Sequence, residues 1–201
     1  MEALQLDALK KYTYEDYEKW PEYPRYELID GVPYMMAAPT RAHQEILINL
    51  SGEFYIQLKG KKCKPYISPF DVRLFPTVFS GGKTVVQPDF LIVCDHNKLD
   101  DKGAKGGPEF VVEVLSPSTG KMDRITKMKQ YEQAGVLEYW VIDPTHRTVA
   151  VYLLKNGSFS RPIEYGLGDI ITVTVIPGLK IDLNDIFDPL PEEPEEDIIR
   201  L

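Results

Sequence analysis

One acidic residue, Glu113, interrupts an otherwise apolar run at 110–115. Such a short run of β-branched and aromatic residues is typical of a buried β-strand. An ionised carboxylate in a buried strand is costly unless it is paired with a cation or bound to a metal. The chain must therefore cover this strand and give Glu113 a partner, which is either an Arg or Lys at a sheet end or a metal ion.

Helical and strand patterns alternate along the rest of the chain. Apolar residues recur every three or four positions over 41–59, and a second helical pattern covers 121–134 before Gly135. With the short strands, these helices predict an α/β (α+β) fold in which a mixed central β-sheet is flanked by helices. We expect a short helix at 14–20, a loop at 96–107, and strands at 26–29, 32–36, 64–68, 71–75, 85–86, 90–94, 109–115, 138–142, 148–154, 159–165 and 170–175.

The composition is that of a globular protein. Hydrophobic residues make up 43% and charged residues 27% of the 201 positions, enough apolar side chains to offset the entropy of ordering. The longest apolar runs fall well short of the roughly 20 residues that a membrane helix needs. Residues 1–12 mix charges with leucines and lack the apolar core of a signal peptide. We therefore expect a cytoplasmic protein in which Cys63 and Cys94 are reduced thiols.

The net charge of −8 argues against a polyanionic partner. The segment 188–201 carries −5 of this charge, and its alternating Pro and Glu residues predict a solvated tail. The remaining body, at −3, can still bind nucleic acid through a local basic surface. A run of lysines is a candidate contact for phosphate, and the alternative is that it forms only a solvated face. The run consists of Lys59, Lys61, Lys62 and Lys64.

Several familiar catalytic sites are missing from the sequence. The three histidines are scattered, and no pair of Cys or His residues has the spacing of zinc ligands. The Gly-rich segment 103–107 lacks the order of a phosphate-binding loop and precedes a strand instead of a helix. No GxSxG turn is present. The remaining candidates for a catalytic role are a small set of carboxylates.

Asp89 is the second acid in a strand context. It follows a Gln-Pro pair and directly precedes the apolar strand at 90–94. If this strand neighbours the one that carries Glu113, the two carboxylates make an all-oxygen site of the kind that Mg²⁺ or Mn²⁺ prefers. The alternative for Asp89 is structural, because Pro-Asp is a common turn and strand-entry pair.

The order of these acids and of the segments around them resembles the PD-(D/E)XK nuclease superfamily. The resemblance is closer to one bacterial restriction-endonuclease family that long carried a domain-of-unknown-function label, and it runs from about residue 26 to 187. It implies a restriction-endonuclease-like core. The matching segments are 26–31, 43–44, 70–74, 87–89, 112–118, 135–136, 138–140 and 143–144, with Asp123, Lys127 and Tyr131.

The chain departs from the superfamily pattern at one position. A lysine normally stands two residues after the second acid, and here that position is Leu115. The family resemblance implies that Lys127, on the following helix, takes the role of this lysine. Asp123 and Lys127 are four apart and share one helical face, so the alternative is a surface lysine paired with Asp123. The competing lysines are Lys121 and Lys129.

The resemblance also implies a catalytic carboxylate at Glu27, for which the alternative is cross-strand pairing on an exposed hairpin. Asp71 and His43 are further candidates for the same cleft, although a turn acid and a helix-start histidine are the more common explanations. The aromatic residues expected in the core beneath the site are Tyr131, Tyr139 and Trp140.

Together with the family resemblance, these residues predict a metal-dependent phosphodiesterase, specifically an endonuclease that hydrolyses DNA, with RNA as an open alternative substrate. Asp89 and Glu113 would bind Mg²⁺ or Mn²⁺ together with the backbone carbonyl of Val114. Glu27 and Lys127 would complete the catalytic set. The alternative is a binding or scaffold protein that keeps the nuclease fold without turnover.

Assembly and domain organisation follow from the same interpretation. We expect a homodimer, because cutting both strands of a duplex favours two-fold symmetry. The chain is expected to divide into an N-terminal helical extension at 1–25, a nuclease domain at 26–187 and an acidic tail at 188–201.

Overall fold

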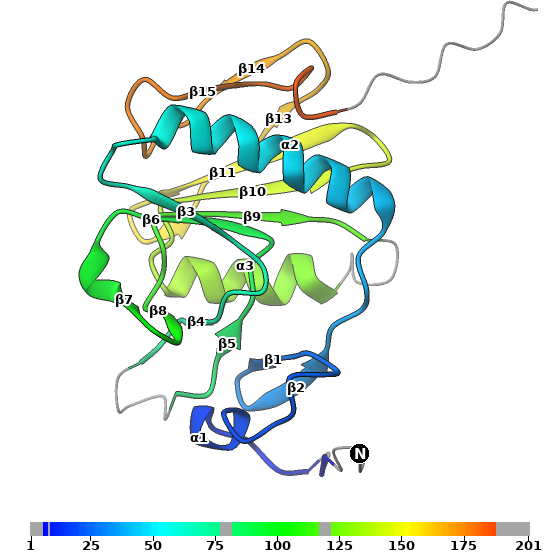
Figure 1. Cartoon of the computed structure of the whole chain (residues 1–201), viewed down its shortest axis with the longest axis vertical. Helices are drawn as coiled ribbons and strands as arrows, with labels where there is room; N and C mark the ends of the chain where they lie inside the picture. The colour runs from blue at the N-terminus through cyan, green and yellow to red at the C-terminus, as the bar shows by residue number, and fades with distance from the viewer. Residues whose placement is uncertain (1–5, 8, 77–81, 117–121, 188–201) are drawn as a thin grey trace, which may run out of the picture.

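The computed structural model describes residues 6–7, 9–76, 82–116 and 122–187, and for 122–124 the backbone alone. A large β-sheet crosses the middle of the molecule. The two long helices, α2 (Arg41–Leu58) and α3 (Met122–Gln133), lie on opposite sides of it (Figure 1). The predicted tail at 188–201 lies outside the described residues. No helix among the described residues is long and apolar enough to cross a membrane.

The N-terminal part builds the smaller of the two main sheets. A capping box at Thr13 starts the short helix α1 (Tyr14–Tyr17). β1 (Tyr26–Ile29) and β2 (Val32–Met35) form the predicted hairpin, whose two turn residues have positive φ. The sheet order is β2-β1-β5-β4-β8-β7, with β5 at Val85–Val86, β4 at Val72–Arg73, β8 at Gly103–Lys105 and β7 at Leu99–Asp100.

The larger sheet carries the strand from which the sequence argument started, β9 (Phe110–Val114). β9 lies between β6 (Phe90–Val93), which is antiparallel to it, and β10 (Glu138–Asp143), which is parallel. Phe90 pairs with Val112, so the residue before β6, Asp89, comes beside Glu113. The remaining strands are β3 (Lys64–Ile67) next to β6, β11 (Thr148–Lys155) next to β10, and β12 (Ser158–Phe159) and β13 (Ile163–Tyr165), both paired with β11.

The two faces of the large sheet pack into two separate cores. On one face, α2 places the fully buried Phe54 against Phe90, Phe110 and Trp140. On the other face, α3 contributes Tyr131, which packs with residues of β9, β10 and the smaller sheet. Successive residues of β9 therefore point into different cores, as the pleat of a strand requires. Glu113 is on the α3 side with Val111, which places its carboxylate between the two sheets.

The predicted α/β (α+β) fold with a mixed central sheet flanked by helices is confirmed, and the small strands add a second sheet that was not expected. The segment 96–107, expected as a loop, holds a 3₁₀ turn (His96–Lys98) and the strands β7 and β8. Gly103 allows β8 to lie close to the backbone next to β4. Its φ is +119°, and a Cβ there would lie 2.1 Å from the carbonyl oxygen of Asp71. The expected strand at 159–165 is split between β12 and β13, and β14 (Ile170–Thr172) pairs with an unpredicted strand, β15 (Lys180–Asp182).

The two cysteines form a disulfide, so the expectation of reduced thiols is wrong for this structure. Lys64 of β3 pairs with Val93 of β6, and one step further along Cys63 and Cys94 face each other with their Cα atoms 4.0 Å apart. The expectation was based on the number of cysteines, and that number does not show that two paired strands bring the cysteines together. The cytoplasmic location stays a prediction.

Candidate active site

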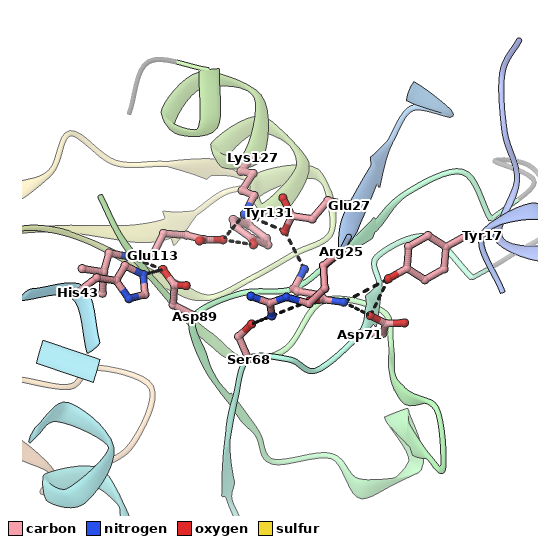
Figure 2. A network of polar contacts seen from close by, with 12 residues as sticks. Tyr17, Arg25, Glu27, His43, Ser68, Asp71, Asp89, Glu113, Lys127 and Tyr131 are labelled. Carbon is pink, nitrogen blue, oxygen red and sulfur yellow. Dashed lines mark hydrogen bonds and ion pairs between the residues drawn. The ribbon is translucent and has the colours of Figure 1, made fainter. Parts of the chain in front are cut away.

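The four residues expected to carry the chemistry come from four elements and meet at one pocket. Glu27 is on β1, Asp89 precedes β6, Glu113 is on β9 and Lys127 is on α3. All four line a cavity of about 740 Å³. Figure 2 shows Lys127 reaching down from α3 between Glu27 and Glu113, with Asp89 close to Glu113. The structure thus brings together residues that are separated by up to 100 positions in the chain.

Lys127 bridges two carboxylates inside the protein. Its Nζ lies 2.8 Å from Oε1 of Glu27 and 3.1 Å from Oε1 of Glu113. Lys127 and Glu27 are each 4% exposed, and Glu113 is 8% exposed. A surface lysine and an exposed hairpin acid, the two structural alternatives, are therefore both wrong. Among the competitors, Lys129 is exposed, whereas Lys121 and the side chain of Asp123 lie outside the described part of the chain.

Glu113 is held in an environment that opposes its negative charge. The pKa of Glu113 is raised to about 8, chiefly by burial and in part by the neighbouring charges of Asp89 and Glu27, while Lys127 acts in the opposite direction. The hydroxyl of Tyr131 donates a hydrogen bond of 2.6 Å to the same oxygen, Oε1, that Lys127 contacts. Tyr131 was expected only as a core aromatic, and the structure shows that it also orients this carboxylate.

Asp89 is fixed from two sides. The backbone N–H of Val114 donates to its Oδ2 at 2.8 Å, which ties the start of β6 to β9. Nε2 of His43, near the start of α2, lies 3.1 Å from the same oxygen. Because a carboxylate oxygen only accepts, this contact calls for a proton on Nε2. Nδ1 of His43 is buried and has no hydrogen-bond partner among the described residues.

His43 and Asp71, the two further cleft candidates, take different places. His43 lines the pocket beside Asp89, so the structural explanation of a helix-start histidine is incomplete. Asp71 instead faces a neighbouring cavity and accepts hydrogen bonds from Tyr17 and Gln87. The candidate lysine run, Lys59, Lys61, Lys62 and Lys64, does not contribute to the lining of the pocket.

Gln87 is the residue that sequence reasoning missed. Its backbone N–H donates to Oε1 of Glu27 at 2.8 Å, and its side chain receives a hydrogen bond from Arg25 and donates to Asp71. Arg25 also donates to Ser68 at 3.2 Å, so the network continues through residues that line the cavity (Figure 2). The available signal was a polar residue directly after the apolar pair Val85 and Val86, a position that is buried in the structure.

The donor set fits a hard divalent cation. Three carboxylates line the pocket, and two of them, Glu27 and Glu113, contact the ammonium group of Lys127, so the pocket is rich in oxygen ligands. The described residues contain no group of three or more Asp, Glu, His or Cys side chains placed to hold a metal. Mg²⁺ does not need one, because it usually takes one or two carboxylates and completes its shell with water and substrate oxygens. Asp89 and Glu113 are the two candidates.

Removing one hydroxyl group tests how tightly Glu113 is held. Tyr131→Phe keeps the buried ring and deletes only the donor to Glu113, so we expect a loss of about 1–3 kcal/mol in the free energy of unfolding. Urea denaturation measures it. Tyr66→Phe is the matched control, since its ring stacks on Phe70 and its hydroxyl has no hydrogen bond to a described residue. Equal stability of Tyr131→Phe and the parent chain would contradict the role of this hydrogen bond.

The fold is that of a restriction-endonuclease-like protein. The chain belongs to the Uma2 family, whose model is described as "Putative restriction endonuclease" and matches residues 14–184. This match confirms the family resemblance seen in the sequence and supports a nuclease-type function. It also begins at the start of α1, so it includes part of the segment expected as a separate extension.

Two individual proteins are similar to this chain. An uncharacterized protein, slr1290, from Synechocystis sp. (strain ATCC 27184 / PCC 6803 / Kazusa) is 30% identical over 180 residues, which are 88% of this chain and 92% of the relative. The crystal structure of "a putative nuclease belonging to DUF820" from Anabaena variabilis ATCC 29413 matches with a TM-score of 0.71 at 18% identity, over 87% of this chain and 97% of that one. At that identity the second comparison supports the fold alone.

Proposed function

We propose that this protein is a metal-dependent phosphodiesterase that acts as an endonuclease on DNA. The observation that carries the proposal is the meeting of Glu27, Asp89 and Glu113 with a single buried lysine at one pocket. Such a cluster is costly, because carboxylates packed this closely repel one another. In a site that binds a cation and then a phosphate group, each of these charged side chains would have a function.

Asp89 and Glu113 would hold Mg²⁺ or Mn²⁺, with the carbonyl of Val114 as a further oxygen ligand. Such a cation, when bound, polarises a scissile phosphate and lowers the pKa of an attacking water. The protein's own contribution lies in Lys127, whose ammonium group can stabilise the negative charge that develops on the phosphate. Glu27 positions this ammonium at 2.8 Å, and Gln87 positions Glu27.

DNA is the proposed polymer on the strength of the family resemblance, and a homodimer is proposed because two-fold symmetry suits cleavage of both strands. The experiment presents supercoiled plasmid, linear duplex and a structured RNA to the full chain with Mg²⁺ or Mn²⁺ in large excess over the protein. We expect nicked and linear plasmid, and complete loss of cleavage on adding a chelator.

Two controls make this result decisive. Glu113→Gln, purified by the same route, excludes a contaminating nuclease if it leaves the plasmid intact. Cleavage of RNA alone would reassign the substrate. No cleavage of either polymer with either metal would favour the alternative, a scaffold that keeps the fold without turnover.

A further inference from the structure

A second cavity of about 720 Å³ adjoins the active-site pocket. Arg25, Pro69 and Gln87 line both spaces, so the two cavities meet along the polar network of Figure 2. We call this second cavity the aromatic groove. Its other lining residues are Tyr14, Tyr17, Trp20 and Tyr26, with Glu18, Pro21, Glu22, Asp71 and Lys102.

The aromatic side of the groove is fixed by contacts between the rings. Trp20 lies 5.5 Å from Tyr17 and 5.6 Å from Tyr26, measured between ring centroids. Behind them, the buried Tyr12 contacts the edge of Trp20 at 5.3 Å. Tyr17, Trp20 and Tyr26 are only half-buried, so each keeps part of its surface toward solvent. The groove therefore has a rigid apolar wall that does not have to be ordered when a flat ligand binds.

The polar side of the groove ends in a carboxylate with one oxygen to spare. Oδ1 of Asp71 accepts hydrogen bonds from the hydroxyl of Tyr17 at 3.0 Å and from Nε2 of Gln87 at 2.9 Å. Oδ2 accepts none from any described residue. Beside β4, the backbone of Asp71 is also held, because its carbonyl accepts from the N–H of Ala104 at 2.9 Å. Asp71 thus presents an acceptor at a fixed position.

Charge argues against a phosphate in this groove. Glu18, Glu22 and Asp71 contribute three carboxylates, whereas the cations are Arg25 and Lys102. Lys102 is paired with Glu18, and Arg25 donates to Ser68 and Gln87. A flat ring that carries an amino group suits such a site better, since the ring can stack on aromatic faces while the amino group donates to a carboxylate.

We propose that the aromatic groove binds an unpaired nucleobase of the strand whose phosphate occupies the active-site pocket, stacking it on the aromatic wall and binding its exocyclic amino group at Oδ2 of Asp71. The proposal rests on the proposed nuclease function, because the continuity of the two cavities through Gln87 is what identifies the occupant. It makes the groove a specificity site that favours bases with an amino group at the edge, cytosine over thymine, at a position next to the scissile phosphate.

The test measures binding without cleavage. Fluorescently labelled pentanucleotides, oligo-dC and oligo-dT, are titrated with the full chain in the presence of a chelator, and anisotropy gives the affinity. We expect oligo-dC to bind more tightly and to quench the emission of Trp20, since the other tryptophan, Trp140, is fully buried. Tyr17→Ala should weaken oligo-dC binding about tenfold, the scale of one lost stacking contact.

Asp71→Asn is the decisive variant because it keeps the shape of the side chain. If the asparagine carbonyl takes the place of Oδ1, its NH₂ group replaces the free acceptor with a donor, so we expect oligo-dC to lose affinity and the preference to shift toward oligo-dT. It decides the matter even if Tyr17→Ala fails to fold. The matched controls are Tyr55→Ala on α2 and Asp101→Asn, both at exposed positions outside the groove, and neither should change the affinity.

Three results would overturn the proposal: no binding of either oligonucleotide, equal binding of both, or an unchanged preference in Asp71→Asn. Binding of the cationic peptide Lys-Trp-Lys in place of the oligonucleotides would reassign the groove to a peptide. Loss of the groove effect with plasmid cleavage intact would leave the nuclease function standing. Base-dependent binding without cleavage of any polymer would instead contradict the nuclease function and retain base recognition.

Discussion

Asp89→Asn and Glu113→Gln are each expected to abolish plasmid cleavage and, with it, the rise in melting temperature that Mn²⁺ gives the parent chain. The physical reason is that a metal that binds only the folded state stabilises it by mass action, and each substitution removes one of two proposed carboxylate ligands. Thermal melting with and without Mn²⁺ measures binding, and the plasmid assay measures turnover.

The metal-free variants should remain folded, and Glu113→Gln should be at least as stable as the parent at neutral pH. In the folded chain the pKa of Glu113 is raised to about 8 from an ordinary value of 4.5. Such a group contributes most to stability below pH 4.5, and the contribution is lost as pH rises toward 8, because the unfolded chain then gains by ionising. A glutamine does not ionise, so the stability of Glu113→Gln relative to the parent should increase as the pH rises from 4.5 to 8.

Glu138→Gln is a control for general damage. Glu138 is fully buried, as Glu113 nearly is, but it accepts hydrogen bonds from Nε1 of Trp140 and from two backbone N–H groups, of Thr174 and Val175. A glutamine cannot satisfy all of these donors, so this variant should melt at a lower temperature and yet keep the full Mn²⁺-induced shift. An unchanged shift in both Asp89→Asn and Glu113→Gln would instead remove the assignment of the metal site.

The long-range pairing of the chain explains what the sequence could and could not predict. The helix at 41–58 and the strand around Glu113 were predictable because their periodicity is local, and burial of one face follows from it. The strands at 72–73 and 85–86 were also expected, but their assembly into a second sheet was not, since it depends on partners more than ten positions away. β7 and β8 were missed because strands of two or three residues leave almost no pattern of their own.

The candidate site likewise contains residues that could be predicted from the sequence and residues that could not. Glu113 could be identified as an acid in an apolar strand, whereas both Lys127 and its partner Glu27 required the family resemblance. His43 and Gln87 could not be ranked from the sequence alone. Their roles come from contacts across 46 positions, from His43 to Asp89, and 60 positions, from Gln87 to Glu27. No periodicity reports such contacts.

Lys127→Ala is expected to lower the rate of cleavage by roughly 100-fold or more, the usual scale for one lost transition-state stabiliser. The burial of Lys127 adds a second effect. Without its ammonium group, Glu27 and Glu113 lose the cation between them, so the fold should lose about 3–5 kcal/mol of stability, the scale for breaking a buried ion pair. A loss of activity in this variant alone would therefore not distinguish a catalytic role of Lys127 from a role in stabilising the fold.

The double variant Lys127→Ala with Glu27→Gln separates the two effects. Neutralising Glu27 removes one of the two buried acidic charges that Lys127 contacts, so urea denaturation should show much of the stability restored, whereas cleavage should stay low because the ammonium group is still missing. Lys129→Ala, at an exposed position two residues away on α3, should change neither quantity. If the double variant recovered cleavage along with stability, Lys127 would serve to hold the fold, and the lysine of the nuclease chemistry would have to be sought elsewhere in the chain.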